Sequence, residues 1–328
     1  MDANQLIGEV REYFRSQGAV YGLDAGTVQV DYVLNWGGFV NASYRVFDAR
    51  RRYHLKVATN NESLEGLAQW HRLAGLLAAY RAPRIVGWIE MSGAAGLLFD
   101  HVDGDTPKTA GPLLDALLPP LARLHRDESL ARELLRTRSA HAPQTAAAAY
   151  HASLHTRFVD DLHLVDADPP PFVSRAQREW LHDEVARLAD RIANAPAFSE
   201  PLQFPVHGDL WLNNILWRNA NDWCLLDWDD LGIGDPAADL ATLVGPTAQD
   251  LQPLKYASRA AAILLPEARL RLPLLGRATL LDWVIDPLAD WIDATSAPEV
   301  MNTVRPEKER VHRTALALYE RLYDSQDA

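Results

Sequence analysis

The chain has 328 residues, of which 48% are hydrophobic and 23% are charged, and this is the balance of a globular protein with a sizeable core. Its formal net charge of −12 makes binding to nucleic acid or to an anionic membrane surface unfavourable, because both need a basic face. A single cysteine, Cys224, excludes an intramolecular disulfide and a cysteine-based zinc site.

The sequence shows no sign of an export or membrane segment. Residues 1–12 are polar and amphipathic and lack the apolar core of a signal peptide. No stretch reaches the length of about 18 uncharged apolar residues that would predict a transmembrane helix. We therefore expect a cytoplasmic protein without membrane or nucleic-acid partners, and the sequence leaves its oligomeric state open.

The first third of the chain predicts a small sheet with one inserted helix. Apolar spacing predicts a helix over 5–16, and another is predicted over 63–79 with Ser63 as its cap. Strand-like runs are expected around 28–32, 43–47, 53–57, 83–86 and 96–99.

The remainder of the chain is mostly helical. Helices are predicted over 113–125, 130–138, 145–165, 174–194, 236–265, 274–293 and 306–324. A strand-rich part followed by a helix-rich part indicates an α+β protein whose two kinds of element are segregated. The composition changes near Asp103, so we expect an N-terminal lobe over 1–102 and a C-terminal lobe over 103–328.

A β-hairpin is predicted inside the helical part, where two apolar runs flank the turn-forming residues 218–222. We expect Trp217 to pair with Cys224. In the same register Asn214 lies opposite Asp227. Opposed residues of an antiparallel pair have Cβ atoms about 4.5–5.5 Å apart, so one cation could bridge the two side chains.

This pair of side chains suits a magnesium site. Mg²⁺ prefers oxygen ligands and is usually held by one or two carboxylates together with substrate phosphates. The run His207-Gly208-Asp209 stands shortly before the hairpin, and in phosphoryl transfer a carboxylate such as Asp209 orients the attacking hydroxyl and accepts its proton. Taken singly, each residue would more often be a cap or a solvated loop group, but their joint spacing favours the functional interpretation.

Two further features lie in the strand-rich part. Gly37 and Gly38 let backbone N–H groups approach a phosphate closely, and a Gly-Gly hairpin turn is the alternative explanation. Lys56 lies in an apolar strand, where an inward ammonium group needs a partner. Glu65 is the expected partner and Glu62 is the alternative.

Together these motifs resemble the aminoglycoside phosphotransferase and choline kinase family, relatives of the protein kinases. The run His207-Gly208-Asp209 with Asn214 resembles the catalytic loop of the family, Asp227 resembles its metal-binding aspartate, and 232–240 resembles the segment that follows. The resemblance implies a bilobal protein-kinase-like α+β fold. Its N-lobe would be a small antiparallel sheet with one main helix, and its C-lobe would be larger and mostly helical.

The resemblance also implies roles for single residues. Asp209 would be the catalytic base, Asn214 and Asp227 would bind Mg²⁺, and Asp239 would brace the catalytic loop. The N-terminal lobe would bind the nucleotide, ATP or GTP, and the C-terminal lobe would carry the catalytic loop and bind the acceptor. The implied nucleotide-binding residues are Gly37, Gly38, Asn41, Lys56, Glu65, Asp100 and Val102. Among them, Asp100 and Val102 would bind adenine through their backbone groups. Lys56 would pair with the phosphates while Glu65 holds it.

An acidic stripe is predicted on the helix over 274–293, where helical spacing aligns Asp282, Asp286 and Asp290. In the family that this chain resembles, the C-terminal helices line the acceptor pocket. The stripe is therefore a candidate site for a cationic acceptor. A solvated helix face is the alternative, and Pro287 could break the helix between the acids.

The implied activity is transfer of the γ-phosphate of ATP or GTP to the hydroxyl group of a small molecule. Aminoglycosides, choline and neutral alcohols all remain open as acceptors, so a resistance enzyme and a metabolic kinase are not separated. The rival interpretation is a catalytically silent nucleotide-binding module. Such modules usually lose the lysine, the base or the metal-binding residue, whereas this chain keeps Lys56, Asp209 and Asp227.

Overall fold

The computed structural model describes residues 3–33, 41–137, 144–245, 256–294 and 298–323. Contacts divide the chain into two compact units. The first unit is Met1–Pro107 with Asn213–Leu231, and the second is Lys108–Leu212 with Gly232–Ala328.

Backbone hydrogen bonds explain why the hairpin segment belongs to the first unit. Trp217 and Asp105 exchange two such bonds, at 3.0 and 3.2 Å, and Leu225 N donates to Arg81 O at 3.1 Å. This division differs from the sequential one at 102/103, since residues 103–107 and 213–231 join the first unit. The nucleotide-binding and acceptor-binding roles of the two parts stay predictions.

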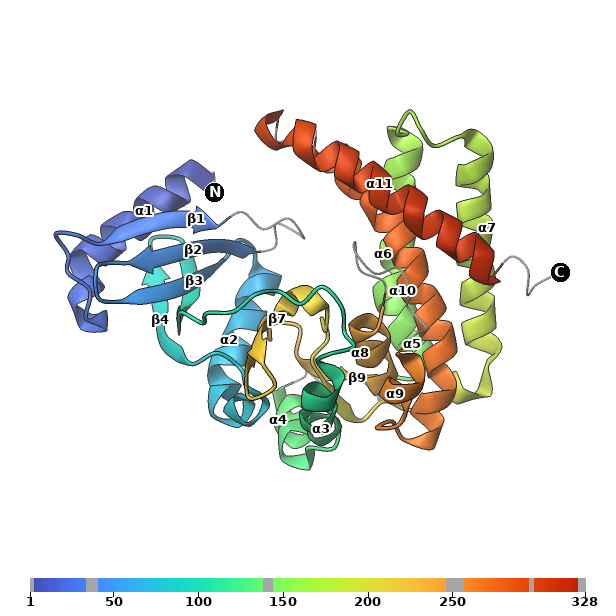
Figure 1. The fold of residues 1–328 in the computed structure, drawn as a ribbon, viewed down its shortest axis with the longest axis horizontal. Helices are drawn as coiled ribbons and strands as arrows, with labels where there is room; N and C mark the ends of the chain where they lie inside the picture. Colours follow the sequence, from blue (N-terminus) through green and yellow to red (C-terminus); the bar gives the residue numbers. More distant parts are fainter. Residues whose placement is uncertain (1–2, 34–40, 138–143, 246–255, 295–297, 324–328) are drawn as a thin grey trace. The chain divides into compact units, whose positions relative to one another are not determined.

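The first unit is built on a five-stranded antiparallel sheet with the strand order β1-β2-β3-β5-β4 (Figure 1). The strands are β1 Gln29–Val33, β2 Asn41–Phe47, β3 Arg52–Ala58, β4 Ile85–Met91 and β5 Ala94–Asp100. Alternate residues of a strand point to opposite faces, and in β3 Tyr53, Leu55 and Val57 are all at most 4% exposed. All five predicted strands are present, and β3 shows the clearest alternation of buried and less buried residues.

Two helices cover the two faces of this sheet. Helix α1 (Ala3–Gln17) contributes Val10 and Phe14 to one core cluster with Leu55 of β3 and other buried strand residues. Helix α2 (Asn61–Leu77) lies on the other face, where the rings of Trp70 and Phe99 are 4.6 Å apart. Short 3₁₀ turns, Gly18–Tyr21 and Ala78–Tyr80, follow the two helices.

The first residue of α2 differs from the predicted one. Asn60 is the N-cap, and its side chain accepts a hydrogen bond from Ser63 N at 2.8 Å. Ser63 is the third residue of the helix, and its hydroxyl accepts from Asn60 N at 3.2 Å. The two residues thus form a reciprocal capping box, which explains why the serine looked like a cap in the sequence.

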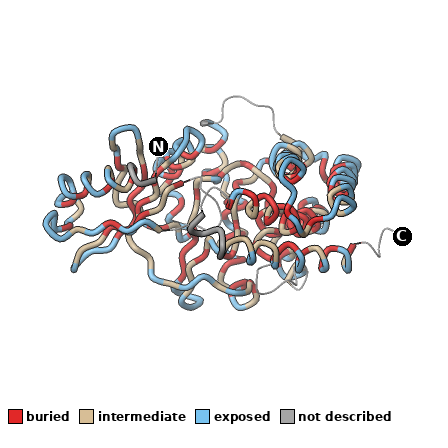
Figure 2. The backbone as a smooth tube through the Cα atoms, turned by 90° about the horizontal axis from the view of Figure 1, so that it is seen from above, coloured by how far each residue is buried: buried red, intermediate tan, exposed pale blue. Residues whose placement is uncertain are grey.

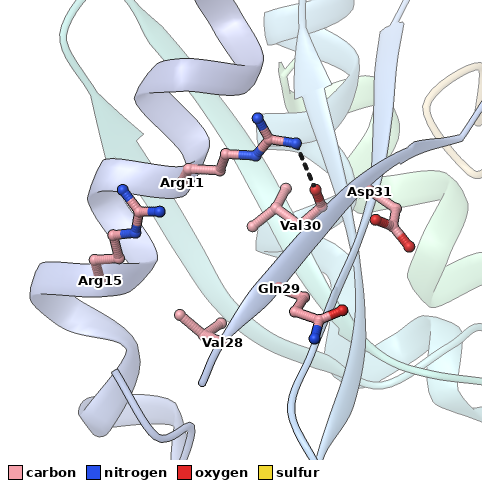
Figure 3. A pocket seen from close by; sticks show the side chains of 6 residues that line it. All are labelled: Arg11, Arg15, Val28, Gln29, Val30 and Asp31. Carbon is pink, nitrogen blue, oxygen red and sulfur yellow. Dashed lines mark hydrogen bonds between the residues drawn. The ribbon is translucent and has the colours of Figure 1, made fainter. Parts of the chain in front are cut away.

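Strand β1 is an edge of the sheet in the described part of the chain, and α1 protects it. Arg11 and Arg15 project from successive turns of α1 beside a cavity of about 260 Å³ against β1 (Figure 3). Arg11 Nη2 donates to Val30 O at 3.3 Å. The guanidinium group thereby covers a carbonyl group of the edge strand. Such contacts protect the edge of a sheet from pairing with another strand.

The second unit is mostly helical (Figure 1). Its helices are α3 Leu114–Leu124, α4 Glu128–Thr137, α5 Ala146–Tyr150, a π-helical turn His151–His155, α6 Thr156–Ala167, α7 Arg175–Asn194, a 3₁₀ turn Pro196–Phe198, α8 Pro236–Leu243, α9 Ala257–Ala261, α10 Pro266–Asp293 and α11 Pro298–Tyr323. The strands β6 Phe204–Val206 and β9 Gly232–Gly234 form a small antiparallel pair.

Helix α10 is the centre of the second unit. It packs against α6, α8 and α11 and is buried over most of its length, as expected for a helix with apolar residues all round. It continues through Pro273 and Pro287, so the proline does not separate the acidic residues. In each unit the buried residues run through the interior, and the outer faces are exposed (Figure 2).

The prediction of one continuous helix over 236–265 is wrong. Helix α8 ends at Leu243, Gly245 follows, and α9 begins only at Ala257. The dipeptide Gly245-Pro246 explains this end, because proline cannot continue a helix and glycine readily leaves helical geometry. Within the described ranges, no helix is both long and apolar enough to cross a lipid bilayer.

Candidate functional site

Lys56 is the centre of a buried polar cluster in the first unit. It lies on β3, beside Ser43 of β2 and Leu97 of β5, and its side chain is only 12% exposed. Lys56 Nζ forms an ion pair with Asp227 and donates to both carboxylate oxygens of Asp229, at 2.8 and 2.9 Å. Two carboxylates thus share one ammonium group.

Asn41, at the start of β2, joins the same cluster. Its Nδ2 donates to Asp229 Oδ2 at 2.8 Å, and the residue is 9% exposed. Its Oδ1 is buried, and no hydrogen-bond partner is found for it in the described part of the chain. An unpaired buried acceptor costs about 1–3 kcal/mol, so this oxygen favours a ligand that brings a donor, such as a metal-bound water molecule.

The electrostatics of the cluster match its geometry. Burial favours the neutral amine of Lys56, but the nearby charges of Asp227 and Asp229 outweigh burial and raise the pKa of the lysine. Burial, together with the neighbouring Asp227, raises the pKa of Asp229 to about 6. One positive and two negative charges leave the cluster short of positive charge, which a divalent cation would provide.

The predicted pairing of Lys56 with Glu65 is not the one in the structure. Glu65 is exposed on α2, and the carboxylate partners of the lysine come from the segment after the hairpin. The face of α2 that meets this segment carries Gly66 and Gln69 instead. A Cβ atom on Gly66 would lie 2.7 Å from Asp229 O, and Gln69 Nε2 donates to Leu231 O at 2.6 Å. Glu65 is exposed and makes no ion pair with Lys56 in the described structure.

The predicted register of the hairpin is wrong by one residue. Strands β7 (Ile215–Asn219) and β8 (Asp222–Leu225) pair Leu216, not Trp217, with Cys224. The register shifts between Trp217 and Asn219, so Arg218 is the extra residue of a β-bulge. A bulge next to a turn is hard to detect from the alternation of apolar and polar residues. It shifts by one residue every strand pair between the bulge and the open end of the hairpin.

The same shift changes the neighbours of the proposed magnesium ligands. Asn214 ends the 3₁₀ turn Leu212–Asn214, and its carbonyl accepts from Leu226 N at 2.7 Å, so it lies opposite Leu226 and not Asp227. Asp227 has a φ of 61°, a left-handed conformation that Asp tolerates better than most residues. Joint binding of Mg²⁺ by Asn214 and Asp227 stays a prediction.

The donor set still fits magnesium. In the described ranges no three His, Cys, Asp or Glu side chains are grouped so that they could hold a metal by themselves. Mg²⁺ commonly takes only one or two carboxylates and completes its shell with waters and substrate phosphates. A site made of Asp227, an asparagine and phosphate oxygens would need no such group.

The loop His207-Gly208-Asp209 is held by a buried carboxylate in the second unit. His207 N and Gly208 N donate to the two oxygens of Asp239, at 2.8 and 3.0 Å, and His125 Nε2 lies 3.0 Å from Asp239 Oδ2. Burial would raise the pKa of Asp239, but its hydrogen bonds and the histidine charges keep that pKa low. The bracing role implied for Asp239 agrees with this geometry.

Asp209 continues the braced loop. Its backbone N–H donates to His207 Nδ1 at 3.3 Å, and Gly208 has a φ of 91°, which glycine adopts without strain. The fixed backbone sets the direction in which the Asp209 side chain leaves the loop. Its role as the catalytic base stays a prediction.

Asp235 anchors the segment that follows in the chain. It caps α8 by accepting from Ala237 N at 2.9 Å, as its position before Pro236 predicts. It also forms a buried pair with Arg271 of α10, with N–O distances of 2.6 and 3.0 Å. The role of Asp235 is therefore structural.

The remaining residues predicted to bind the nucleotide are two glycines and two residues at the end of β5 and after it. Gly37 and Gly38 lie outside the described residues. Asp100 ends β5, and its N–H donates to Arg84 O at 3.0 Å, so an adenine contact of Asp100 cannot use this N–H. Val102 follows and is half-buried, and its contact with adenine stays a prediction.

The acidic stripe on α10 is not a solvated face. Asp282 is 5% exposed and pairs with Arg157 of α6, while Asp290 pairs with Lys308 of α11. Between them, Asp286 has its pKa raised to about 7, first by burial and then by the charges of Asp282 and Asp290, against Arg157 and Lys308.

Other side chains extend this acidic region. Burial raises the pKa of Asp282, and the charge of Asp209, also in the second unit, adds to this rise. Burial raises the pKa of Asp161, on α6, to about 6. The rings of Trp211 and Trp283 stand edge to face at 5.8 Å. Arg157, Asp161 and Lys308 could not be predicted from the sequence, because they lie on other helices and no local pattern marks them.

Comparison with known proteins confirms the family resemblance of the chain. The model of the phosphotransferase enzyme family matches residues 31–273. Viomycin phosphotransferase of Streptomyces vinaceus is 34% identical over 85 residues, which are 25% of this chain and 27% of that relative's length.

Two solved structures share the fold over nearly the whole chain. Choline kinase from Cryptosporidium parvum Iowa II is 14% identical, with 99% of this chain and 97% of that chain covered at a TM-score of 0.60. Spectinomycin phosphotransferase, solved with ADP and spectinomycin, is 12% identical, with 97% and 98% covered at a TM-score of 0.60. These likenesses confirm the predicted bilobal, kinase-like α+β fold. Since the family model matches most of its length, this chain belongs to the phosphotransferase enzyme family.

Proposed function

We propose that this protein is a small-molecule kinase that transfers the γ-phosphate of ATP or GTP to a hydroxyl group. The observation that carries the proposal is the ion pair between Lys56 and Asp227, which joins residues 171 positions apart in the chain. A buried lysine beside a carboxylate suits a phosphate chain and its cation, and so does the nearby Asn41 oxygen, for which the described residues provide no hydrogen-bond partner.

Each residue would have one role. Lys56 would pair with the phosphates, and Asn214 and Asp227 would hold the magnesium ion. When bound, Mg²⁺ would neutralise charge on the phosphate oxygens. Asp209 would orient the acceptor hydroxyl and take its proton, on a loop that Asp239 keeps rigid.

The test of this activity is ADP release by the purified protein with a panel of alcohols. Asp209→Ala should lower transfer by about 10²–10⁴-fold, the usual contribution of a general base, while Mg·ATP binding stays near that of the wild type. Asp183→Ala, an exposed acid on α7, is the matched control and should change neither quantity. Loss of nucleotide binding in Asp209→Ala would contradict the role given to Asp209.

The acceptor proposed here is cationic. Asp209, Asp282, Asp286 and Asp161 contribute negative charge to one region of the second unit, and Arg157 and Lys308 offset part of it. An ammonium group there would relieve the repulsion. Trp211 and Trp283, which follow Asp209 and Asp282 closely in the chain, would offer aromatic rings to the same cation.

Paired acceptors with and without an amino group test the acceptor class. Asp286→Asn should raise KM for the cationic acceptor and leave KM for its neutral counterpart unchanged. Asp183→Asn again serves as the control. Equal effects of Asp286→Asn on both acceptors would remove the argument for a cation. A protein that binds nucleotide and turns over no acceptor would instead favour the silent nucleotide-binding module.

A further inference from the structure

Asp229 is the carboxylate that accepts the most hydrogen bonds in the described part of the Lys56 cluster. Its carboxylate accepts two hydrogen bonds from Lys56 Nζ and one from Asn41 Nδ2, all between 2.8 and 2.9 Å. Its side chain is 11% exposed, compared with 31% for Asp227. Asp229 therefore links β2 and β3 through their two buried polar side chains.

The backbone around Asp229 is fixed from two sides. Trp228 is fully buried, and its Nε1 donates to Leu225 O at 2.7 Å. On the other side α2 approaches so closely that a Cβ atom on Gly66 would lie 2.9 Å from Asp229 Cβ. A carboxylate held in this way offers a constant position to whatever it binds.

Lys56 needs one permanent counter-ion. A buried ammonium left without a partner is strongly unfavourable. In the proposed function Asp227 gives its oxygens to a cation, and Glu65 is exposed on α2. Asp229 is the carboxylate that keeps its contact with the lysine when Asp227 is engaged.

We propose that Asp229 is a positioning residue that anchors Lys56 for nucleotide binding, in place of the glutamate expected on α2. It holds the amine over the sheet and ties it to Asn41, so that lysine and asparagine face the phosphates together. The anchor belongs to the segment that carries Asp227, and not to helix α2. This inference rests on the proposed function for its nucleotide, but the anchor itself is a property of the protein alone.

The anchor is tested without nucleotide by labelling lysines with an amine-reactive reagent and following each site by mass spectrometry. Asp229→Asn keeps the shape of the side chain and removes one of the two negative charges beside Lys56, so the lysine amine should label faster than in the wild type. In an Asp227→Asn background, where Asp229 is the remaining carboxylate partner of the lysine in the described structure, adding Asp229→Asn should speed labelling at least about tenfold. Lys308, which pairs with Asp290 in the second unit, is the internal reference and should not change. Glu65→Gln should leave labelling of Lys56 within about twofold.

Calorimetric binding of Mg·ADP is the second measurement. Asp229→Asn should weaken binding by about tenfold or more, and Glu65→Gln should not weaken it. A larger effect of Glu65→Gln than of Asp229→Asn on either measurement would overturn the proposal, as would wild-type labelling of Lys56 in Asp229→Asn. Asn41→Ala, which removes one bond to Asp229, should give an intermediate labelling rate and covers the case in which Asp229→Asn does not fold.

The two proposals fail in different ways. If the wild-type protein binds no nucleotide, the proposed function fails, while the labelling rates still decide whether Asp229 or Glu65 holds Lys56. If nucleotide binds and the labelling of Lys56 follows Glu65, the anchor fails and the proposed function stands.

Discussion

Gly66 lies in the middle of a helix, yet its replacement by alanine should lower the stability of the protein. Replacing a glycine inside a helix by alanine usually stabilises a protein by about 0.5–1 kcal/mol, because alanine loses less backbone entropy. At Gly66 the added Cβ atom would lie 2.7 Å from Asp229 O and 2.9 Å from Asp229 Cβ. Both neighbouring atoms belong to the backbone or Cβ of Asp229 and not to the end of a flexible side chain, so backbone must move, and such overpacking costs about 1–3 kcal/mol.

Gly75 is the matched control, because it lies on the same helix and a Cβ atom there meets nothing within 4 Å. The entropy gain is common to both variants, so their difference isolates the clash. Gly75→Ala should be slightly more stable than the wild type, and Gly66→Ala should be less stable than Gly75→Ala by about 1–3 kcal/mol.

Urea unfolding followed by tryptophan fluorescence measures this difference. Trp70 on α2 and Trp228 beside Asp229 both belong to the first unit and report on its unfolding. Gly66→Ala should also weaken Mg·ADP binding, since it displaces the anchor of Lys56. The reasoning is refuted if Gly66→Ala is as stable as Gly75→Ala.

Four further predictions follow from buried groups. Asp239→Asn should lower the free energy of unfolding by about 3–5 kcal/mol, because it breaks a buried charged network, and a loss under 1 kcal/mol in urea unfolding would contradict the bracing role. Arg271→Met should be less stable than the double variant Arg271→Met/Asp235→Asn, because the single change leaves a buried charge unpaired; the reverse order of urea midpoints would count against this. Burial raises the pKa of Asp286 from 3.8 to about 7 in the folded protein, so its favourable contribution to the free energy of unfolding is complete below about pH 4 and is lost as pH rises through 7. Asp286→Asn should therefore raise Tm at pH 8 and not at pH 4. Equal changes in Tm at both pH values would contradict this prediction. Burial raises the pKa of the Cys224 thiol to about 12, so a thiol reagent should react far more slowly with the native protein than with the unfolded chain, and equal rates would show that the thiol is not buried.

The sequence by itself determined the strands of the sheet in the first unit and the two motifs that resemble those of the family. Alternation in 53–57 identified β3 and its buried face, because a strand repeats every two residues and one face must be apolar. The run His207-Gly208-Asp209 and the aspartate at 227 could be read directly, because their spacing along the chain is itself the signal.

Only the tertiary structure decided which side chains meet. Lys56 pairs with Asp227 and Asp229 rather than with Glu65, nine residues away, because the rotation of α2 turns Gly66 and Gln69 toward that segment. Asp282 pairs with Arg157, 125 positions earlier in the chain. Local periodicity fixes the face on which a residue lies, whereas the partner it finds there depends on packing between segments that the sequence keeps far apart.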